Sequence, residues 1–231
     1  MLFEASVDDI IQRTHNVKSF RFSCPSSFSY EAGQFLFAII KKGEEELKKP
    51  FTISSSPTEE FIEFTKKMTG HEFSNMLDSL HVGDYIKIDA PYGKLVLDKQ
   101  QKKTCMLSGG IGITPLRSMC RYATDLHLKT NIILLYGNET YEDIAFRQEL
   151  KQMEKENENL KVVHILNKPP SNWDGYTGYI NAEVIQNEIP DYKQRVFYTC
   201  GPPGMVNAMT NLLHTLDVNN EQIIIENFAG Y

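Results

Sequence analysis

The chain has 231 residues, of which 41% are hydrophobic and 23% charged, and its formal net charge is −6. Its length suits one large domain or two compact ones, and its composition is that of a folded globular protein. Both halves are mildly acidic, which argues against a nucleic-acid-binding platform.

The four cysteines, Cys24, Cys105, Cys120 and Cys200, are widely spaced, and the six histidines do not cluster in the sequence. We therefore expect no metal site of the iron–sulfur or zinc-ribbon kind. Reduced cysteines suit a cytoplasmic protein. The early charges of the N-terminus are unlike a signal peptide, and no stretch approaches the ~18 apolar residues of a membrane span.

The N-terminal half reads as short β-branched or aromatic segments separated by Pro, Gly, Ser or charged clusters, which predicts strands. One helix is expected at residues 72–80, where Phe73, Met76, Leu77 and Leu80 recur at helical spacing. Several short strands with turn signals predict a small antiparallel β-barrel. The expected strands are residues 3–11, 17–24, 34–40, 50–56, 61–67 and 84–90.

The pattern then changes to apolar strands that alternate with helices, which predicts a buried parallel sheet in a Rossmann-like α/β domain. The charged link Leu97–Lys103 marks the change, so we expect one domain at residues 1–98 and a second at residues 99–231. The expected strands are residues 104–108, 131–137, 161–166, 196–201 and 222–228, and the longer helices are residues 146–157 and 202–216.

The stretch "LSGGIGITPLRSM" places Gly109, Gly110 and Gly112 between a strand and a helix that begins near Thr114. The following proline suits a first helical turn. Glycines allow close backbone approach, and a helix N-terminus favours a pyrophosphate. The spacing differs from the dinucleotide fingerprint, so an ordinary tight turn is the alternative.

A second junction, "TCGPPGMV", again ends a strand with glycine and begins a helix with proline. In a parallel sheet both junctions lie at the same carboxyl edge, where ligands bind. Cys200 would lie at this edge, and the alternative is a small buried core residue.

The stretch "KKPFTISSSP" combines a cation, Lys49, with an aromatic, Phe51, and a hydroxyl, Thr52. On a strand Lys49 and Phe51 share one face and Thr52 the other. A cation can hold a phosphate and an aromatic can stack on a flat ring, although an ordinary strand has the same pattern. Downstream, Gly70 and Ser74 stand at a helix start, where Ser74 is either a cap or a phosphate ligand.

Taken in order, "AGQF", "KPFT", the Gly/Ser helix start, "GGIGITP", "CGPPGM" and "ENF" resemble the ferredoxin–NADP⁺ reductase superfamily across essentially the whole chain. The stretches "LLYGNETYEDIAFRQEL" and "SNWDGYTGYIN" are most similar to its cytochrome b-five reductase branch. The chain length and the "AGQF" and "KPFTISSSP" stretches also resemble bacterial NAD(P)H–flavin reductases. The resemblance implies a flavin-binding barrel followed by a nicotinamide-binding domain.

In that family an Arg-x-Tyr-Ser/Thr motif binds FAD, and the resemblance transfers its roles to three residues. Lys49 would hold the pyrophosphate, Phe51 would pack on the isoalloxazine, and Thr52 would approach flavin N5. Lysine lacks the bidentate fork of arginine, and phenylalanine lacks the tyrosine hydroxyl. The other FAD-binding residues that it implies are Pro50, Thr65, Lys66, Lys67, Gly70, Phe73 and Ser74.

The resemblance also implies a hydride-transfer site. Cys200 would lie near nicotinamide C4, Glu226 and Phe228 match the family's C-terminal acid and aromatic, and Phe228 would cover the flavin. Tyr231 is a rival for that covering role, and a terminal strand with an exposed tail is the structural alternative. The residues implied for the nicotinamide coenzyme are Gly109, Gly110, Gly112, Thr114, Cys200, Gly201 and Pro202, and the catalytic set is Thr52, Cys200, Glu226 and Phe228.

The turn Gly137–Thr140 after the second parallel strand contains no cation, and Glu139 would repel a 2′-phosphate. This favours NADH over NADPH, and Arg147 carries little weight because it lies within a helical run. The aromatic loop with Trp173 and Tyr179 is either a packing plug, which we favour, or part of an adenosine pocket.

We expect an FAD-containing NADH-dependent reductase that passes electrons to a separate protein acceptor such as ferredoxin, flavodoxin, a haem protein or an oxygenase component. A flavin reductase that uses free flavin as its substrate is one alternative. A non-catalytic flavin- or nucleotide-binding subunit is the other.

Overall fold

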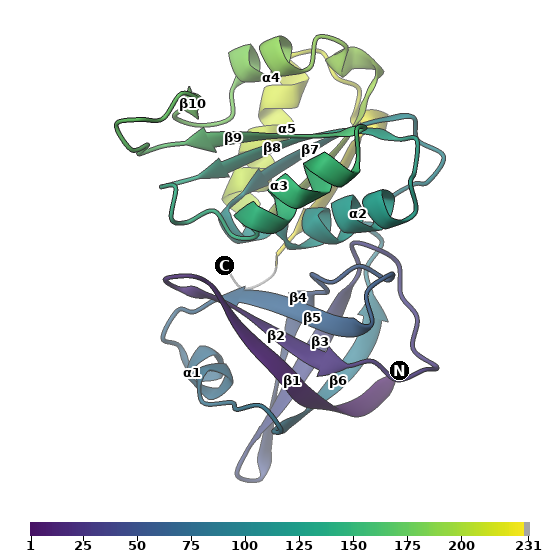
Figure 1. Cartoon of the computed structure of the whole chain (residues 1–231), viewed down its shortest axis with the longest axis vertical. Coiled ribbons are helices and arrows are strands. Elements are labelled where there is room, and N and C mark those ends of the chain that lie inside the picture. Colours follow the sequence, from purple (N-terminus) through teal and green to yellow (C-terminus); the bar gives the residue numbers. More distant parts are fainter. Residues whose placement is uncertain (229–231) are drawn as a thin grey trace.

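The computed structural model describes residues 1–228, and of Lys42 the backbone alone. Each half of the chain forms a six-stranded sheet, with strand order β4-β3-β6-β1-β2-β5 in the first and β10-β9-β8-β7-β11-β12 in the second. Figure 1 shows the two halves as separate domains that meet at the centre of the molecule. The first sheet is antiparallel and the second parallel, which confirms the expected fold class.

The N-terminal sheet buries the inner face of each strand around Phe20, Phe22 and Phe64. An isolated antiparallel bridge between Ile53 and Phe64 brings the end of β4 beside β5, although these are the two edge strands of the sheet. The elements of this domain are β1 Leu2–Thr14, β2 Val17–Ser23, β3 Phe35–Lys42, β4 Glu45–Thr52, β5 Phe61–Lys67, α1 Glu72–Asp78 and β6 Tyr85–Tyr92.

Strand β4 differs from the expectation of residues 50–56. It begins at Glu45 and ends at Thr52, so its first half is the polar segment "EELKK". An edge strand with one exposed side tolerates such charges, and the apolar pattern therefore gave no signal for it. The serines after Thr52 lie beyond the strand and are buried between the domains.

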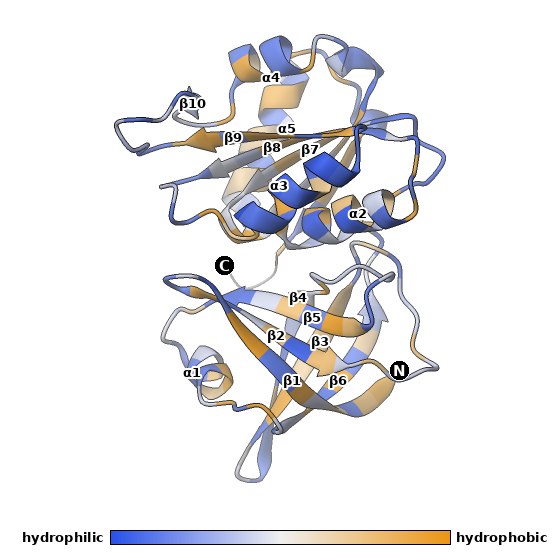
Figure 2. Cartoon of the chain, viewed as in Figure 1, coloured by the Kyte–Doolittle hydropathy of each residue, from blue (hydrophilic) through white to orange (hydrophobic). Residues whose placement is uncertain are grey.

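In the C-terminal domain, helices α2 and α3 cover the face of the sheet that looks toward the N-terminal domain, and α4 and α5 cover the other face (Figure 1). Figure 2 shows β9 largely hydrophobic and the visible face of α3 hydrophilic, as expected for a buried parallel sheet. The elements are β7 Lys103–Gly109, α2 Ile113–Asp125, β8 Asn131–Asn138, α3 Arg147–Glu156, β9 Leu160–Leu166, β10 Tyr176–Thr177, α4 Ala182–Glu188, β11 Val196–Gly201, α5 Pro203–Thr215 and β12 Ile223–Asn227.

The carboxyl ends of β7 and β11 lie side by side because these two strands pair in parallel. Both glycine-containing turns therefore occupy one edge of the sheet, as the sequence predicts. The chain returns to the same edge after β12, where the Phe228 amide donates a 2.9 Å hydrogen bond to the Gly201 carbonyl.

Candidate active site

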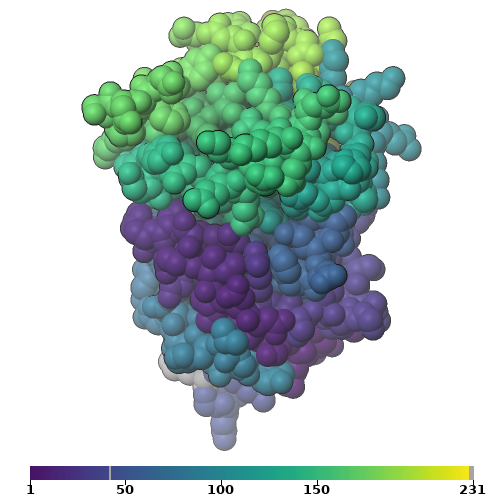
Figure 3. All heavy atoms as spheres, in the orientation of Figure 1, coloured from purple at the N-terminus to yellow at the C-terminus, as the bar shows by residue number. Residues whose placement is uncertain are grey.

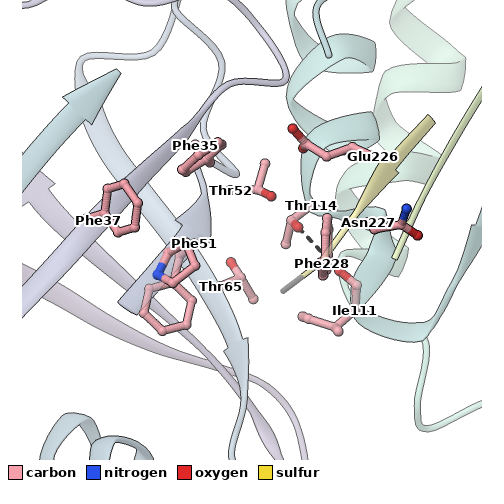
Figure 4. Close-up of a pocket in the computed structure, with 11 residues that line it drawn as sticks. Phe35, Phe37, Phe51, Thr52, Thr65, Ile111, Thr114, Glu226, Asn227 and Phe228 are labelled. Atoms are coloured by element: carbon pink, nitrogen blue, oxygen red, sulfur yellow. Dashed lines mark hydrogen bonds between the residues drawn. The ribbon is translucent and has the colours of Figure 1, made fainter. Parts of the chain in front are cut away.

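A cavity of about 270 Å³ lies between the two domains, and side chains from both face into it (Figure 4). One wall comes from β3, β4 and β5 of the N-terminal domain. The other comes from the glycine turn, the start of α2 and residues 226–228. The lining residues are Phe35, Phe37, Pro50, Phe51, Thr52, Thr65, Ile111, Thr114, Glu226, Asn227 and Phe228.

The Phe51 ring is held in place by aromatic packing on its inner side. It stacks on Phe64 with ring centroids 4.8 Å apart and planes 15° apart, and the Phe73 ring centroid is 5.7 Å away. Phe228 faces the same cavity from the opposite domain (Figure 4). Two aromatic side chains on opposite walls, one of them fixed by packing, fit a flat ring system such as isoalloxazine.

Glu226 supplies the acidic group of this cavity. Burial raises the pKa of its carboxyl to about 7. A carboxyl with such a pKa changes protonation near neutral pH and can exchange a proton with a bound reactant.

Cys200 is the register partner of Glu226 across β11 and β12, and it is fully buried. Its Sγ donates to the Gly112 carbonyl at 3.2 Å. Burial, and after it the negative charge of Glu226, raise the pKa of the thiol well above its ordinary value. The sulfur is therefore a neutral S–H group rather than a reactive thiolate.

A second cavity of about 840 Å³ follows the carboxyl edge of the parallel sheet. Ile111 lines both cavities, so they meet at the glycine turn. The N-terminal domain contributes to the second cavity as well, through His15, Asn16 and Val17 at the β1–β2 turn and through Lys67. A long ligand could therefore extend from the sheet edge toward the first cavity.

Two polar side chains in the second cavity have buried atoms with no hydrogen-bond partner among the described residues. They are the Ser108 hydroxyl, at the end of β7, and both amide atoms of Asn138, at the end of β8. An unpaired buried polar group is costly, so these atoms fit a ligand with its own donors and acceptors, such as a dinucleotide. Ser108 was not among the residues predicted from the sequence, and Asn138 was considered only as part of the turn Gly137–Thr140, although both lie at carboxyl ends of parallel strands, where ligands bind.

The structure divides the candidate residues between the two cavities. The first is lined by Pro50, Phe51, Thr52, Thr65, Thr114, Glu226 and Phe228. The second is lined by Lys67, Gly109, Gly110 and Pro202. The candidates outside both linings are Lys49, Lys66, Gly70, Phe73, Ser74, Gly112, Cys200 and Gly201.

Several of the candidates outside both cavities make contacts within the N-terminal domain. Phe73 supports Phe51 from behind, and the Lys66 Nζ lies 5.9 Å from the Phe51 ring centroid. Ser74 is the third residue of α1 rather than its cap, and its hydroxyl accepts a 3.0 Å hydrogen bond from the Thr69 amide. Their FAD contacts stay predictions, as do those of exposed Lys49, and Tyr231 lies outside the described residues.

The aromatic loop contributes one side chain to packing and another to the second cavity, and its role in an adenosine pocket stays a prediction. Trp173 packs edge-on against Tyr141 and donates its indole N–H to the Tyr176 carbonyl at 3.0 Å. Tyr179, by contrast, is 72% exposed and lines the second cavity. Among residues 1–228, no three His, Cys, Asp or Glu side chains gather as metal ligands. None of the described helices has the length and apolar composition needed to cross a bilayer.

Comparison with known proteins gives two family matches along the chain. The Oxidoreductase FAD-binding domain family matches residues 4–97, and the Oxidoreductase NAD-binding domain family matches residues 106–211. NADH-cytochrome b5 reductase 1 of Dictyostelium discoideum is 32% identical over 220 residues, which are 90% of this chain and 76% of that protein.

A second relative, the glycine betaine monooxygenase reductase subunit of Pseudomonas aeruginosa, is 31% identical over 88% of this chain, which spans 58% of that subunit. Among solved structures, the FAD/NAD-binding domain of a Vibrio cholerae nitric oxide dioxygenase superposes with a TM-score of 0.87 at 20% identity, covering 97% of this chain and 98% of that one. The chain thus belongs to the ferredoxin–NADP⁺ reductase superfamily, as an oxidoreductase with an FAD-binding domain followed by an NAD-binding domain.

Proposed function

We propose that this protein is an NADH-dependent reductase that collects a hydride on FAD and passes the electrons to a separate protein acceptor. The observation that carries the proposal is the meeting of the two cavities at Ile111. One cavity has the aromatic walls that a flavin needs. The other follows the glycine turn, where a dinucleotide pyrophosphate would bind.

Bound FAD would accept two electrons from the nicotinamide and release them one at a time. The chain's own residues bind and orient the reactants. Phe51 and Phe228 would enclose the flavin ring, and Thr52 presents a hydroxyl from the end of β4. The Glu226 carboxyl, with its pKa raised by burial to about 7, is placed to hold or release a proton at the cavity wall.

The preference for NADH rests on the turn after β8. Glu139 lines the second cavity, and its carboxylate pairs with the Lys168 Nζ at 2.8 Å. The hydrogen bonds from Lys168 and Asn167 lower the pKa of Glu139, so the group is ionised at neutral pH. A 2′-phosphate would meet this negative charge, whereas a ribose hydroxyl could donate to it.

The acceptor is proposed from the two relatives. One is named for cytochrome b5 and the other for a monooxygenase of which it is the reductase subunit. We propose that the acceptor here is likewise a separate one-electron carrier, either a haem protein or an oxygenase component.

An anaerobic absorbance titration of the purified protein tests the proposal. A bound flavin spectrum that bleaches with one equivalent of NADH, and far less with NADPH, would support it. A colourless protein that oxidises NADH only after free FAD is added would instead indicate a flavin reductase. Reoxidation of the reduced protein by cytochrome b5, compared with reoxidation by an iron–sulfur oxygenase component, would then identify the class of acceptor.

A further inference from the structure

A network of six charged side chains joins the two domains on the side of α2 and α3. In the orientation of Figure 3 the N-terminal and C-terminal atoms are in continuous contact along this boundary. The network contains three arginines and three glutamates, so its formal charges cancel. Its members are Arg13, Arg21, Glu59 and Glu63 from the N-terminal domain and Arg117 and Glu149 from the C-terminal domain.

Arg117 is the centre of this network, and its side chain is only 3% exposed. Its guanidinium donates to both carboxylate oxygens of Glu59, including Oε1 at 3.0 Å. It also donates to Glu149 Oε2 at 2.5 Å and 3.0 Å, and to the Ser54 carbonyl at 3.1 Å. Burial disfavours its charge, but Glu59 and Glu149 outweigh burial and raise the pKa of Arg117, so it stays charged.

Arg13 crosses the boundary in the opposite direction. From β1 it donates to Glu63 at 2.8 Å and also pairs with Glu149 on α3. Glu149 is thus shared by one arginine from each domain. The Phe146 ring is close to both guanidiniums, with its centroid 4.6 Å from the Arg13 Cζ and 5.6 Å from the Arg117 Cζ.

The network connects two sequence motifs of the active site. Ser54, whose carbonyl Arg117 binds, follows Thr52 by two residues in "KPFTISS". Arg117 itself follows Thr114 on α2, the helix that begins at the glycine turn. One guanidinium therefore ties the flavin-side strand end directly to the coenzyme-side helix start.

Glu63 extends the network to the wall of the first cavity. Its Oε1 accepts a 2.8 Å hydrogen bond from the Ser54 hydroxyl, which in turn lies 2.8 Å from the Thr65 hydroxyl. Thr65 lines the cavity where the flavin is expected. The charges at the domain boundary are thus hydrogen-bonded, through Ser54, to Thr65, one of the residues that line this cavity.

Buried ion networks add little net stability, because desolvation offsets the attraction between the charges. What bidentate arginine contacts do supply is a fixed geometry. Hydride transfer depends steeply on geometry, since a misplacement of about 1 Å can lower the rate about 100-fold. A fixed relation between the two domains is therefore worth more to the reaction than to the stability of the fold.

We infer that Arg117 is a positioning residue that fixes the coenzyme domain against the flavin domain for hydride transfer. The reaction breaks the nicotinamide C4–H bond and moves the hydrogen with both electrons to the flavin, leaving NAD⁺. The inference rests on the proposed reduction of FAD by NADH, and Arg117 lines neither cavity.

The test compares Arg117→Met with Arg121→Met by anaerobic stopped-flow reduction of the FAD-bound protein. Arg121 lies one turn further along α2 and pairs with Asp125 and Glu156 of its own domain. At saturating NADH we expect R117M to reduce its flavin about 100-fold more slowly, with the Kd for NADH little changed, and R121M to match the wild type. Reduction by 1-benzyl-1,4-dihydronicotinamide, which lacks the adenosine half, should be equally fast in all three proteins.

A second readout requires no turnover. In calorimetry we expect the wild type and R121M to unfold in one transition, and R117M to unfold in two because its domains are no longer coupled. Should R117M not yield a folded protein, Arg117→Lys is tested in its place, because lysine keeps the positive charge but cannot make the bidentate contacts of a guanidinium. We expect this variant to reduce its flavin about tenfold more slowly than the wild type.

Wild-type rates in R117M or R117K would overturn the inference. So would a loss of rate explained entirely by weaker NADH binding, or an equal loss with the small dihydronicotinamide. A wild-type protein that NADH does not reduce at all would instead contradict the proposed function, so the two failures are distinguishable.

Discussion

Gly112 and Cys200 are packed against each other so closely that a Cβ on Gly112 would lie 2.4 Å from the Cys200 carbonyl oxygen. The Cys200 thiol completes the contact by donating to the Gly112 carbonyl. The two turns at the carboxyl edge of the parallel sheet therefore pack backbone against backbone. Glycine is required at position 112 because the Cys200 backbone leaves no room for a Cβ.

Gly112→Ala should destabilise the protein by about 3 kcal/mol, because the clash is with backbone that cannot rotate away. Gly204→Ala is the matched control, since a Cβ there meets no heavy atom within 4 Å. Gly204 lies in α5, where alanine should stabilise by up to about 1 kcal/mol. Urea unfolding midpoints measure both effects. Equal midpoints for G112A and the wild type would show that the two turns can separate at little cost.

Glu226 should make stability depend on pH, because burial raises the pKa of its carboxyl from 4.5 to about 7. The folded protein then binds this proton more tightly than the unfolded chain does, so the group's contribution is full below about pH 4.5 and is lost as pH rises through 7. Glu226→Gln should be more stable than the wild type at pH 8, by on the order of 1–2 kcal/mol after allowance for partial exposure.

The gain in Glu226→Gln should shrink as the pH is lowered toward about 5, where the wild-type carboxyl is itself neutral. Denaturation of both proteins at the two pH values measures it. Glu221→Gln, at an exposed acid just before β12, should show no such change. A gain that is the same at both pH values would mean that the Glu226 carboxyl is ionised throughout.

Ser108→Ala and Asn138→Ala should weaken NADH binding by about tenfold each, which is the value of one neutral hydrogen bond. Ser108→Ala should at the same time leave the coenzyme-free protein as stable or more stable, because its buried hydroxyl has no partner among the described residues. Fluorescence titration with NADH, together with thermal unfolding, separates the two effects. Unchanged affinity in both variants would place the dinucleotide elsewhere.

Glu139→Gln should raise kcat/KM for NADPH by about tenfold, because it removes a negative charge and releases the Lys168 ammonium from its 2.8 Å ion pair. Lys168→Met is the opposing control and should keep NADPH a poor substrate. Steady-state kinetics with both coenzymes give the ratio. If the ratio of kcat/KM for NADPH to that for NADH is the same in Glu139→Gln and the wild type, the turn after β8 does not distinguish a 2′-phosphate from a 2′-hydroxyl.

The order of strands and helices was predictable because each segment has an apolar periodicity of its own. The aromatic and glycine motifs were predictable because each is a short local pattern of residues. The start of β4 was not, since "EELKK" is an exposed edge with no apolar alternation. The contact of Arg13 with Glu149 joins positions 136 residues apart, and the assignment of Lys67 to the second cavity depends on how the domains meet. Such long-range contacts arise only from tertiary packing, which cannot be predicted from a local sequence pattern.

The β1–β2 turn has a consequence for how this protein could be recombined with its relatives. His15, Asn16 and Val17 belong to the flavin domain, yet they line the cavity at the edge of the other domain's sheet. A chimera that exchanges only the C-terminal domain would inherit one wall of its coenzyme cavity from each parent. The fit of a coenzyme in such a chimera would therefore depend on this hairpin of the first domain as well as on the exchanged domain.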